Sequence, residues 1–218
     1  PNPMIKFINV SHSYKIKFGK NIIFSDLNFS VSKGDKIGII GRNGAGKSTL
    51  LRLIGGVEEP NSGKVIKKMS ISWPLAFGGG FQGSLSGLDN TRFICRVYNK
   101  PLEGAEQYIQ QFAELGDYFY EPVKSYSSGM RAKLAFGISM LIDFDCYLID
   151  EITAVGDASF QEKCNQELFV NKKESAMVIV SHDENVIKDK CDSVLLIDSG
   201  NGTYFSDVNE AFSVYNNN

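Results

Sequence analysis

The sequence predicts an α/β protein built on a parallel β-sheet, and three features of the chain lead to this fold class. Short apolar runs of the kind that lie buried in a parallel sheet occur at Lys36–Ile40, Cys146–Ile149 and Ala176–Val180. Stretches with the apolar spacing of helices separate these runs. The first run continues through a glycine-rich loop into a helix. Strands that alternate with helices are typical of parallel sheets.

The beginning of the chain is expected to form two strands ahead of the first buried one. Ile5–Val10 alternates between inward and outward positions, and Ile22–Val31 does so less regularly. A turn that contains glycine then leads to Lys36–Ile40. The helical stretch Lys47–Ile54 follows the glycine-rich loop, so the order here is strand, loop, helix.

The middle of the chain is expected to be helical. One helix lies around Gly104–Phe112, and another opens at Ser127 or Ser128. Further on, Phe160, Cys164 and Leu168 give a helix its apolar stripe. We therefore expect one domain over residues 4–215, with a core formed by 4–85 and 143–215, a helical subdomain over 86–142, and a natural start at Met4 that leaves 1–3 outside it.

Composition narrows the class of protein. The 218 residues are 43% hydrophobic and 22% charged, as in ordinary globular proteins, and 23 basic against 25 acidic residues give a net charge of −2. Because this balance lacks the positive excess that drives non-specific binding to nucleic acid, we expect no nucleic-acid partner. The longest apolar run, Leu134–Ile142, is shorter than the ~20 residues of a spanning helix, and no secretion signal is evident. We therefore expect a cytoplasmic protein, with its four dispersed cysteines as reduced core residues.

A phosphate-binding loop is the strongest chemical signal. Gly41–Ser48 reads GRNGAGKS and satisfies the pattern GxxxxGK[ST] after a buried strand and at a helix start. Glycines let consecutive backbone N–H groups face phosphate oxygens, and the helix N-terminus adds partial positive charge. Lys47 is expected to reach the β- and γ-phosphates, and the hydroxyl of Ser48 to coordinate Mg²⁺. The alternative is an ordinary glycine-rich turn.

Two further signals lie later in the chain. Asp150 and Glu151 end a buried strand, where Asp150 would hold Mg²⁺ and Glu151 would act on the attacking water, although such a pair is also typical of a solvated strand end. Ser127, Ser128 and Gly129 open a helix and could donate to an anion, or could simply form its N-terminal cap.

With these motifs in this order, the chain from Ile5 to about Tyr215 resembles the nucleotide-binding domain of ATP-binding cassette (ABC) transporters. The resemblance implies a P-loop NTPase (RecA-like) core with an N-terminal antiparallel β subdomain and an inserted α-helical subdomain. It implies that Tyr14 stacks on adenine, that Gln82 is the glutamine loop and that His182 is the switch histidine. Taken singly, these residues could be a half-buried strand aromatic, a loop amide and a helix-start residue.

The resemblance assigns residues to three roles in an ATPase that uses ATP and Mg²⁺. The residues expected in catalysis are Glu151, His182 and Gln82. Those expected to hold Mg²⁺ are Ser48, Gln82 and Asp150. Those expected to bind ATP are Tyr14, Gly41, Asn43, Gly44, Ala45, Gly46, Lys47, Ser48, Thr49, Ser127, Ser128 and Gly129.

Departures from the commonest family pattern point to a subfamily. Tyr126–Met130 reads YSSGM where many relatives have LSGGQ. Together with Ser72–Pro74 and residues 79–85, this departure resembles the ATP-binding subunits of exporters of surface polysaccharide, in particular capsular polysaccharide. The resemblance implies a homodimer that docks on membrane-spanning permease subunits, which handle the polysaccharide, at the cytoplasmic face of the bacterial inner membrane. Export of O-antigen or teichoic acid is the alternative, and the end of the chain soon after Tyr215 favours capsule.

Two other classes of protein are weighed against this one. A soluble ABC ATPase of translation or DNA repair would need a second cassette or a long coiled-coil insertion. A small P-loop kinase shares the phosphate loop and the size, but it would have no use for a signature helix and a switch histidine.

Overall fold

The computed structural model describes residues 2–75, 80–151 and 155–218, and the chain forms two compact units. The first consists of Pro1–Ser72, Phe144–Glu151 and Glu174–Asn218, and the second of Trp73–Asp143 and Ile152–Lys173. The second unit thus takes in residues on both sides of the segment 86–142 that was expected to be helical. Gly79 of the exporter-like segment lies outside the described residues.

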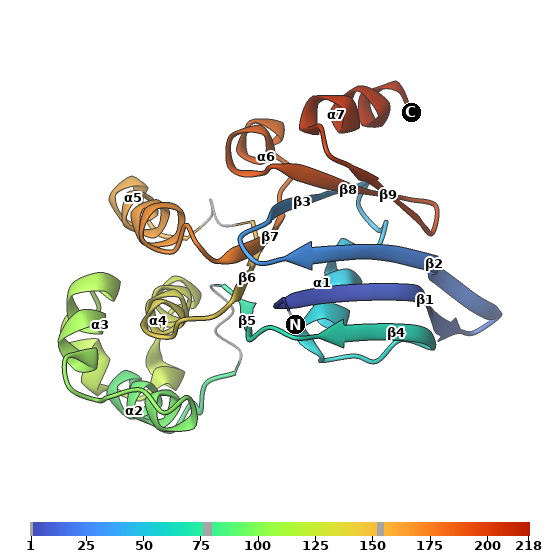
Figure 1. The fold of residues 1–218 in the computed structure, drawn as a ribbon. Helices are drawn as coiled ribbons and strands as arrows, with labels where there is room; N and C mark the ends of the chain where they lie inside the picture. Colours follow the sequence, from blue (N-terminus) through green and yellow to red (C-terminus); the bar gives the residue numbers. More distant parts are fainter. Residues whose placement is uncertain (1, 76–79, 152–154) are drawn as a thin grey trace. The chain divides into compact units, whose positions relative to one another are not determined.

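Two sheets form the first unit, and they confirm the predicted parallel core (Figure 1). Strands β6, β7, β3 and β8 are parallel neighbours, and β9 pairs antiparallel with β8. The other sheet is antiparallel, in the order β2-β1-β4. The strands are β1 (Met4–Ile16), β2 (Gly19–Ser32), β3 (Lys36–Ile40), β4 (Ser62–Lys67), β5 (Ile71–Pro74), β6 (Cys146–Asp150), β7 (Ala176–Val180), β8 (Ser193–Asp198) and β9 (Asn201–Phe205).

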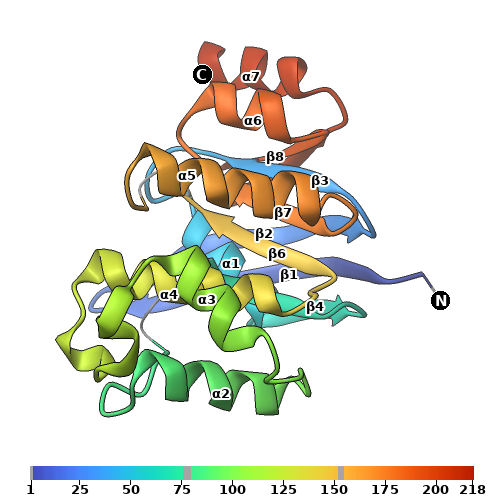
Figure 2. The same cartoon turned by 90° about the vertical axis from the view of Figure 1, so that its left-hand side faces the viewer.

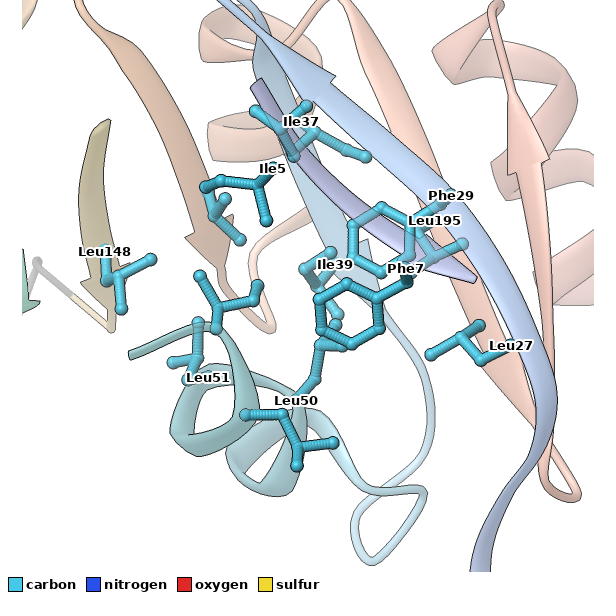
Figure 3. Close-up of a cluster of buried hydrophobic side chains, with 14 of the residues drawn as sticks. Ile5, Phe7, Leu27, Phe29, Ile37, Ile39, Leu50, Leu51, Leu148 and Leu195 are labelled. Atoms are coloured by element: carbon cyan, nitrogen blue, oxygen red, sulfur yellow. The ribbon is translucent and has the colours of Figure 1, made fainter. Parts of the chain in front are cut away.

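A hydrophobic core joins the two sheets of the first unit through α1 (Lys47–Gly55). Side chains from β1, β2, β3, β6, β8 and α1 meet there, as Figure 3 shows. Helices α6 (Glu184–Lys190) and α7 (Val208–Asn217) lie on the other side of the larger sheet (Figures 1 and 2). Because α1 is held against buried strands, the loop that precedes it has a fixed support.

Strands β1 and β2 are longer than the alternation of the sequence predicts. The predicted segments were Ile5–Val10 and Ile22–Val31, whereas β1 continues to Ile16 and β2 begins at Gly19. Register shifts between Phe7 and Ser13 interrupt the period of two, so that the far half of the hairpin does not continue the alternation of the near half.

Helices form the second unit, and α4 begins where the sequence predicts (Figure 2). Phe112 lies at the centre of an aromatic cluster, with ring centroids 5.8 Å from Tyr108, 5.9 Å from Phe136 and 5.3 Å from Phe160. The helices are α2 (Gly87–Val97), α3 (Ala105–Ala113), α4 (Ser128–Leu141) and α5 (Ala158–Asn165), which continues as a π-helical segment Gln166–Asn171; short 3-10 turns lie at Gly116–Tyr120 and Val123–Ser125.

All four cysteines are buried free thiols, as the sequence predicts. Burial raises the pKa of Cys146, Cys164 and Cys191 to about 12, so these thiols are protonated and inert at neutral pH. None of the helices in the described part of the chain is long and apolar enough to cross a bilayer.

Two lysines hold Asp143 in the second unit and make its contribution to stability depend on pH. Lys100 Nζ donates to Oδ2 at 2.8 Å and Lys172 Nζ donates to Oδ1 at 2.6 Å. These hydrogen bonds lower the pKa of Asp143 to about 2, and the one from Lys100 has the larger effect. Because the folded pKa lies below the unfolded one, the stabilisation is present above about pH 4 and is lost as the pH falls towards 2.

We therefore expect Asp143→Asn to lower the free energy of unfolding at pH 5 and to differ less from wild type as the pH falls. The side chain is 72% exposed, so the effect at pH 5 should stay below about 1 kcal/mol and should shrink in high salt. Urea titrations at several pH values measure it, with the exposed Asp117→Asn as control. A difference that is constant from pH 5 to pH 3 would contradict the assignment.

Candidate functional site

At two positions of the loop between β3 and α1, a Cβ would be too close to other parts of the chain, so only glycine fits. Gly46 has φ 110°, and a Cβ there would lie 2.5 Å from Cγ2 of Ile23. A Cβ on Gly41 would lie 2.7 Å from the carbonyl oxygen of Ile197. Gly46 is also the N-cap of α1 and offers no side chain to the first turn, so the N–H groups of that turn are available to an anion.

Lys47 is folded back on its own loop. Its Nζ donates to the carbonyl oxygen of Gly41 at 2.6 Å, and the residue is 8% exposed. Burial lowers the pKa of Lys47, while the charges of Glu151 and Asp150 act to raise it. A partly desolvated ammonium of this kind attracts phosphate more strongly than one in bulk water.

Asp150 is the last residue of β6, and Glu151 follows it at the carboxyl edge of the sheet. β6 and β3 both pair with β7, so this pair and the phosphate loop come to the same edge. Burial and the neighbouring charge of Glu151 raise the pKa of Asp150, and the charges of Lys47 and His182 oppose this rise. A cation bound beside Asp150 would therefore stabilise the charged form of its carboxyl group.

His182 and the backbone fix the position of Glu151. Glu151 has φ 53°, in the left-handed region, and its N–H donates to the carbonyl oxygen of Val180 at 3.0 Å. Its Oε1 accepts a hydrogen bond from the backbone N–H of His182 at 3.1 Å and lies 3.5 Å from Nε2 of the same residue. Such an unusual backbone conformation, held by two hydrogen bonds, is a feature that clusters at functional sites.

One cavity of about 370 Å³ brings together most of the predicted residues of the first unit. Gly41 and Ala45 support this cavity without lining it, since Gly41 holds Lys47 and the N–H of Ala45 donates to the carbonyl oxygen of Arg42 at 3.0 Å. The predicted residues that line it are Tyr14, Asn43, Gly44, Gly46, Lys47, Ser48, Thr49, Asp150, Glu151 and His182.

The residues of this cavity fit a divalent cation that is held jointly with a phosphate. Ser48 and Asp150 both line it and present oxygen atoms, which Mg²⁺ prefers. No group of three or more His, Cys, Asp and Glu side chains within 2–75, 80–151 and 155–218 could hold a metal by itself. Mg²⁺ in such sites takes one or two protein ligands, and phosphate and water supply the others.

The remaining predicted residues lie in the second unit, and the structure describes each in its own surroundings. Gln82 is exposed; its N–H donates to Oδ1 of Asn90 at 3.1 Å, and its Nε2 donates to Oγ of Ser84 at 3.2 Å. Ser127 is the N-cap of α4, and its Oγ accepts from the N–H of Met130 at 3.1 Å. The capping interpretation is thus confirmed, and Ser127, Ser128 and Gly129 are all exposed. Their part in binding ATP stays a prediction.

Sequence reasoning missed three residues that line the cavity, Asn21, Ile23 and Val180. Asn21 is the cross-strand partner of Tyr14, so the pairing of β1 with β2 brings it there. That pairing could have been found from the sequence only if the register past the bulges of the hairpin had been known.

Comparison with known proteins places these features in context. The family described as "ABC transporter" matches residues 24–154. The chain is 51% identical over 213 residues to the capsule polysaccharide export ATP-binding protein CtrD of Neisseria meningitidis serogroup B, which covers 98% of this chain and 99% of that protein. It is 38% identical over 188 residues to the O-antigen export system ATP-binding protein RfbB of Klebsiella pneumoniae, which covers 84% of this chain and 76% of that protein.

The fold has a solved counterpart. A dimeric ATP-binding cassette in a post-hydrolysis state, bound to ADP and phosphate, superposes with a TM-score of 0.77 at 21% identity, over 92% of this chain and 97% of that one. This likeness confirms the ATPase-cassette fold that the sequence predicts.

Proposed function

The chain belongs to the ABC transporter family, and from this we propose that it is the ATP-binding and ATP-hydrolysing subunit of an exporter of capsular polysaccharide. The observation that carries the proposal is the cavity, where the phosphate loop faces two carboxylates and a histidine. The choice of capsule over O-antigen rests on the identities of 51% and 38% to the respective relatives. A small P-loop kinase is disfavoured because the chain belongs to the ABC transporter family.

Lys47 and the first turn of α1 bind the phosphates in this proposal. Lys47 exchanges the carbonyl oxygen of Gly41 for β- and γ-phosphate oxygens, and the first turn of α1, which begins at Lys47, offers backbone N–H groups to the same anion. Ser48 and Asp150 hold Mg²⁺, which neutralises charge on the phosphates when it is bound.

Glu151 acts on the attacking water. Its Oε1 already accepts the N–H of His182, and its second oxygen remains to accept a proton from water in line with the γ-phosphate. The ring of His182 is 59% exposed and adjoins Glu151, so it is placed to contact the γ-phosphate. The two residues therefore share one task, which is to orient the water and its target.

A second copy of the chain completes the site. Ser127 and Gly129 are exposed at the start of α4, where the hydroxyl O–H of Ser127 is still available as a donor because capping uses only its oxygen. We place these groups on the γ-phosphate held by Lys47 of the other copy. Hydrolysis then removes the anion that holds the two copies together.

A membrane permease is the third participant, and it docks close to Gln82 at the cytoplasmic face of the inner membrane. Residues 83–90, which follow Gln82, are our candidate contact surface. Asn90 is 4% exposed and its amide bonds to the carbonyl oxygens of Gln82 and Ser86, so it holds the loop from inside. Ser84, Leu85 and Asp89 are the exposed members that can meet a partner.

Co-expression with the permease subunit of a capsule exporter tests this function. The two proteins should co-purify, and the permease in vesicles should stimulate ATP hydrolysis several-fold. Leu85→Ala should reduce the stimulation and leave basal hydrolysis unchanged, because the exposed side chain of Leu85 is none of the groups assigned above to binding or catalysis. Leu102→Ala, also exposed in the second unit, serves as the matched control. Absence of stimulation, or transfer of phosphate to a small acceptor, would overturn the proposal.

A further inference from the structure

A network of polar side chains holds Tyr14 at the wall of the cavity. The hydroxyl of Tyr14 donates to Oε2 of Glu58 at 2.6 Å and accepts from Nη2 of Arg52 at 3.1 Å. Nε of Arg52 donates to Oε1 of Glu58 at 2.6 Å. His12 completes the network, with its Nε2 at 2.9 Å from Oε2 of Glu58. Glu58 thus receives three donors, from two elements that are far apart in the sequence.

The chemistry of Glu58 sets the direction of each bond. A carboxylate can only accept, so Nε2 of His12 carries the proton that faces it. Nδ1 of His12 is buried without a hydrogen-bond partner in the described part of the chain, and the residue is 6% exposed. A buried nitrogen without a hydrogen-bond partner lowers the stability of the fold. The orientation of the ring therefore satisfies Nε2, through Glu58, at the expense of Nδ1.

The network leaves the ring of Tyr14 as its only group for a ligand. The hydroxyl is engaged by Glu58 and Arg52, and Thr49 Oγ1 lies 3.4 Å from it. The ring of His12 packs against that of Tyr14 at 5.1 Å and 88°, which further limits rotation. The ring is therefore ordered before any ligand arrives, and binding need not supply that ordering.

The network also joins the aromatic wall to the phosphate-binding helix. Arg52 lies in the last turn of α1, and Lys47 lies in the first turn of the same helix. Thr49, on that helix, lines the cavity and accepts from Nη2 of Arg52 at 3.2 Å. The wall that would meet a base and the turn that would meet phosphates thus belong to one connected structure.

We propose that Glu58, with Arg52 and His12, is a positioning residue that orients Tyr14 for stacking on the base of the nucleotide, and that Tyr14 recognises the base through its ring alone. The inference rests on the proposed binding of ATP. It predicts that the loss of Glu58 weakens the part of ATP affinity that comes from the nucleoside and spares the part that comes from the phosphates.

The experiment compares the dissociation constants of Mg-ATP and Mg-tripolyphosphate by calorimetry on the full chain. In the wild type, the dissociation constant of Mg-tripolyphosphate divided by that of Mg-ATP gives the gain in affinity that the nucleoside contributes. Glu58→Ala should reduce this ratio about fivefold or more, because a stacked base contributes strongly to affinity and an unfixed ring stacks poorly. Tyr14→Phe, which keeps the ring and removes the anchored hydroxyl, should reduce it in the same direction.

The control is Glu59→Ala, which removes the same charge from the exposed neighbouring residue and should leave the ratio unchanged. An unchanged ratio in both Glu58→Ala and Tyr14→Phe would overturn the inference, as would an equal loss of affinity for both ligands, which indicates a general structural role. A wild type that fails to bind Mg-ATP would instead overturn the proposed function.

Discussion

Replacing Glu151 with glutamine is expected to slow ATP hydrolysis at least about 100-fold while ATP binding is kept. Glutamine has the shape of glutamate, and its amide oxygen can still accept the N–H of His182 that lies 3.1 Å from Oε1. The backbone at φ 53° is therefore expected to stay as it is. The neutral amide cannot take a proton from water, so the chemical step alone should fail.

Phosphate release in single-turnover conditions measures hydrolysis, and calorimetry measures ATP binding, so the two effects of the substitution can be separated. Glu210→Gln, an exposed position on α7 in the same unit, makes the same chemical change away from the cavity and should behave as wild type. Wild-type turnover by Glu151→Gln would refute the assigned role. Loss of ATP binding would show that Glu151 supports the cavity itself.

The same variant should accumulate as an ATP-bound dimer, because the γ-phosphate that we propose to join the two copies is not consumed. A substitution at Gly129, added to Glu151→Gln, tests the contact across that dimer. Among the described residues, a Cβ at Gly129 would meet only Oγ of Ser127, at 3.9 Å. Alanine also favours a helix more than glycine does, so Gly129→Ala should fold well. If the double variant still binds ATP and stays monomeric in size-exclusion chromatography, the contact across the dimer is supported. A double variant that dimerises as well as Glu151→Gln would argue against the place given to Gly129.

The phosphate loop could be predicted from the sequence because the pattern that marks it lies in one short stretch of the chain. The buried strand Lys36–Ile40 and the helix start at Lys47 are where the sequence predicts them. Glycine at positions 41 and 46 avoids close contacts with Ile197 and Ile23, which are distant in the sequence, but the spacing of the glycines is visible in the sequence itself. The strand that ends in Asp150 is likewise fixed by its own apolar run.

The support of Tyr14 could not be predicted, since it depends on partners distant in the sequence. Glu58 meets Tyr14 and His12 only after β1 has paired into its sheet and α1 has packed against the core. No local pattern marks Glu58, which stands beside a second glutamate in an exposed-looking turn. Asn90 is similar: it reads as a polar helix residue, yet its amide is buried and holds the loop that contains Gln82. Long-range register and packing decide such residues.

Replacing Lys47 with alanine is expected to weaken ATP binding about 10- to 100-fold, with little change in stability. Without the ammonium, the carboxylates of Asp150 and Glu151 face the phosphates uncompensated, which adds repulsion to the lost attraction. Burial already lowers the pKa of Lys47, so the folded chain bears a cost for keeping this charge. Removing the charge removes this cost, which offsets the loss of the hydrogen bond to Gly41. The free energy of unfolding should therefore stay within about 1 kcal/mol of wild type.

Calorimetry with Mg-ATP and Mg-tripolyphosphate distinguishes this effect from a change in the aromatic wall. Lys47→Ala should weaken both ligands by the same factor, because we propose that Lys47 contacts the phosphates alone, whereas a change at Glu58 should weaken the binding of ATP. Lys68→Ala, exposed in the same unit, should change neither. If Lys47→Ala bound ATP as tightly as wild type, the loop would be an ordinary glycine turn after all. If it weakened ATP and spared tripolyphosphate, the triphosphate would have to lie elsewhere than on the first turn of α1.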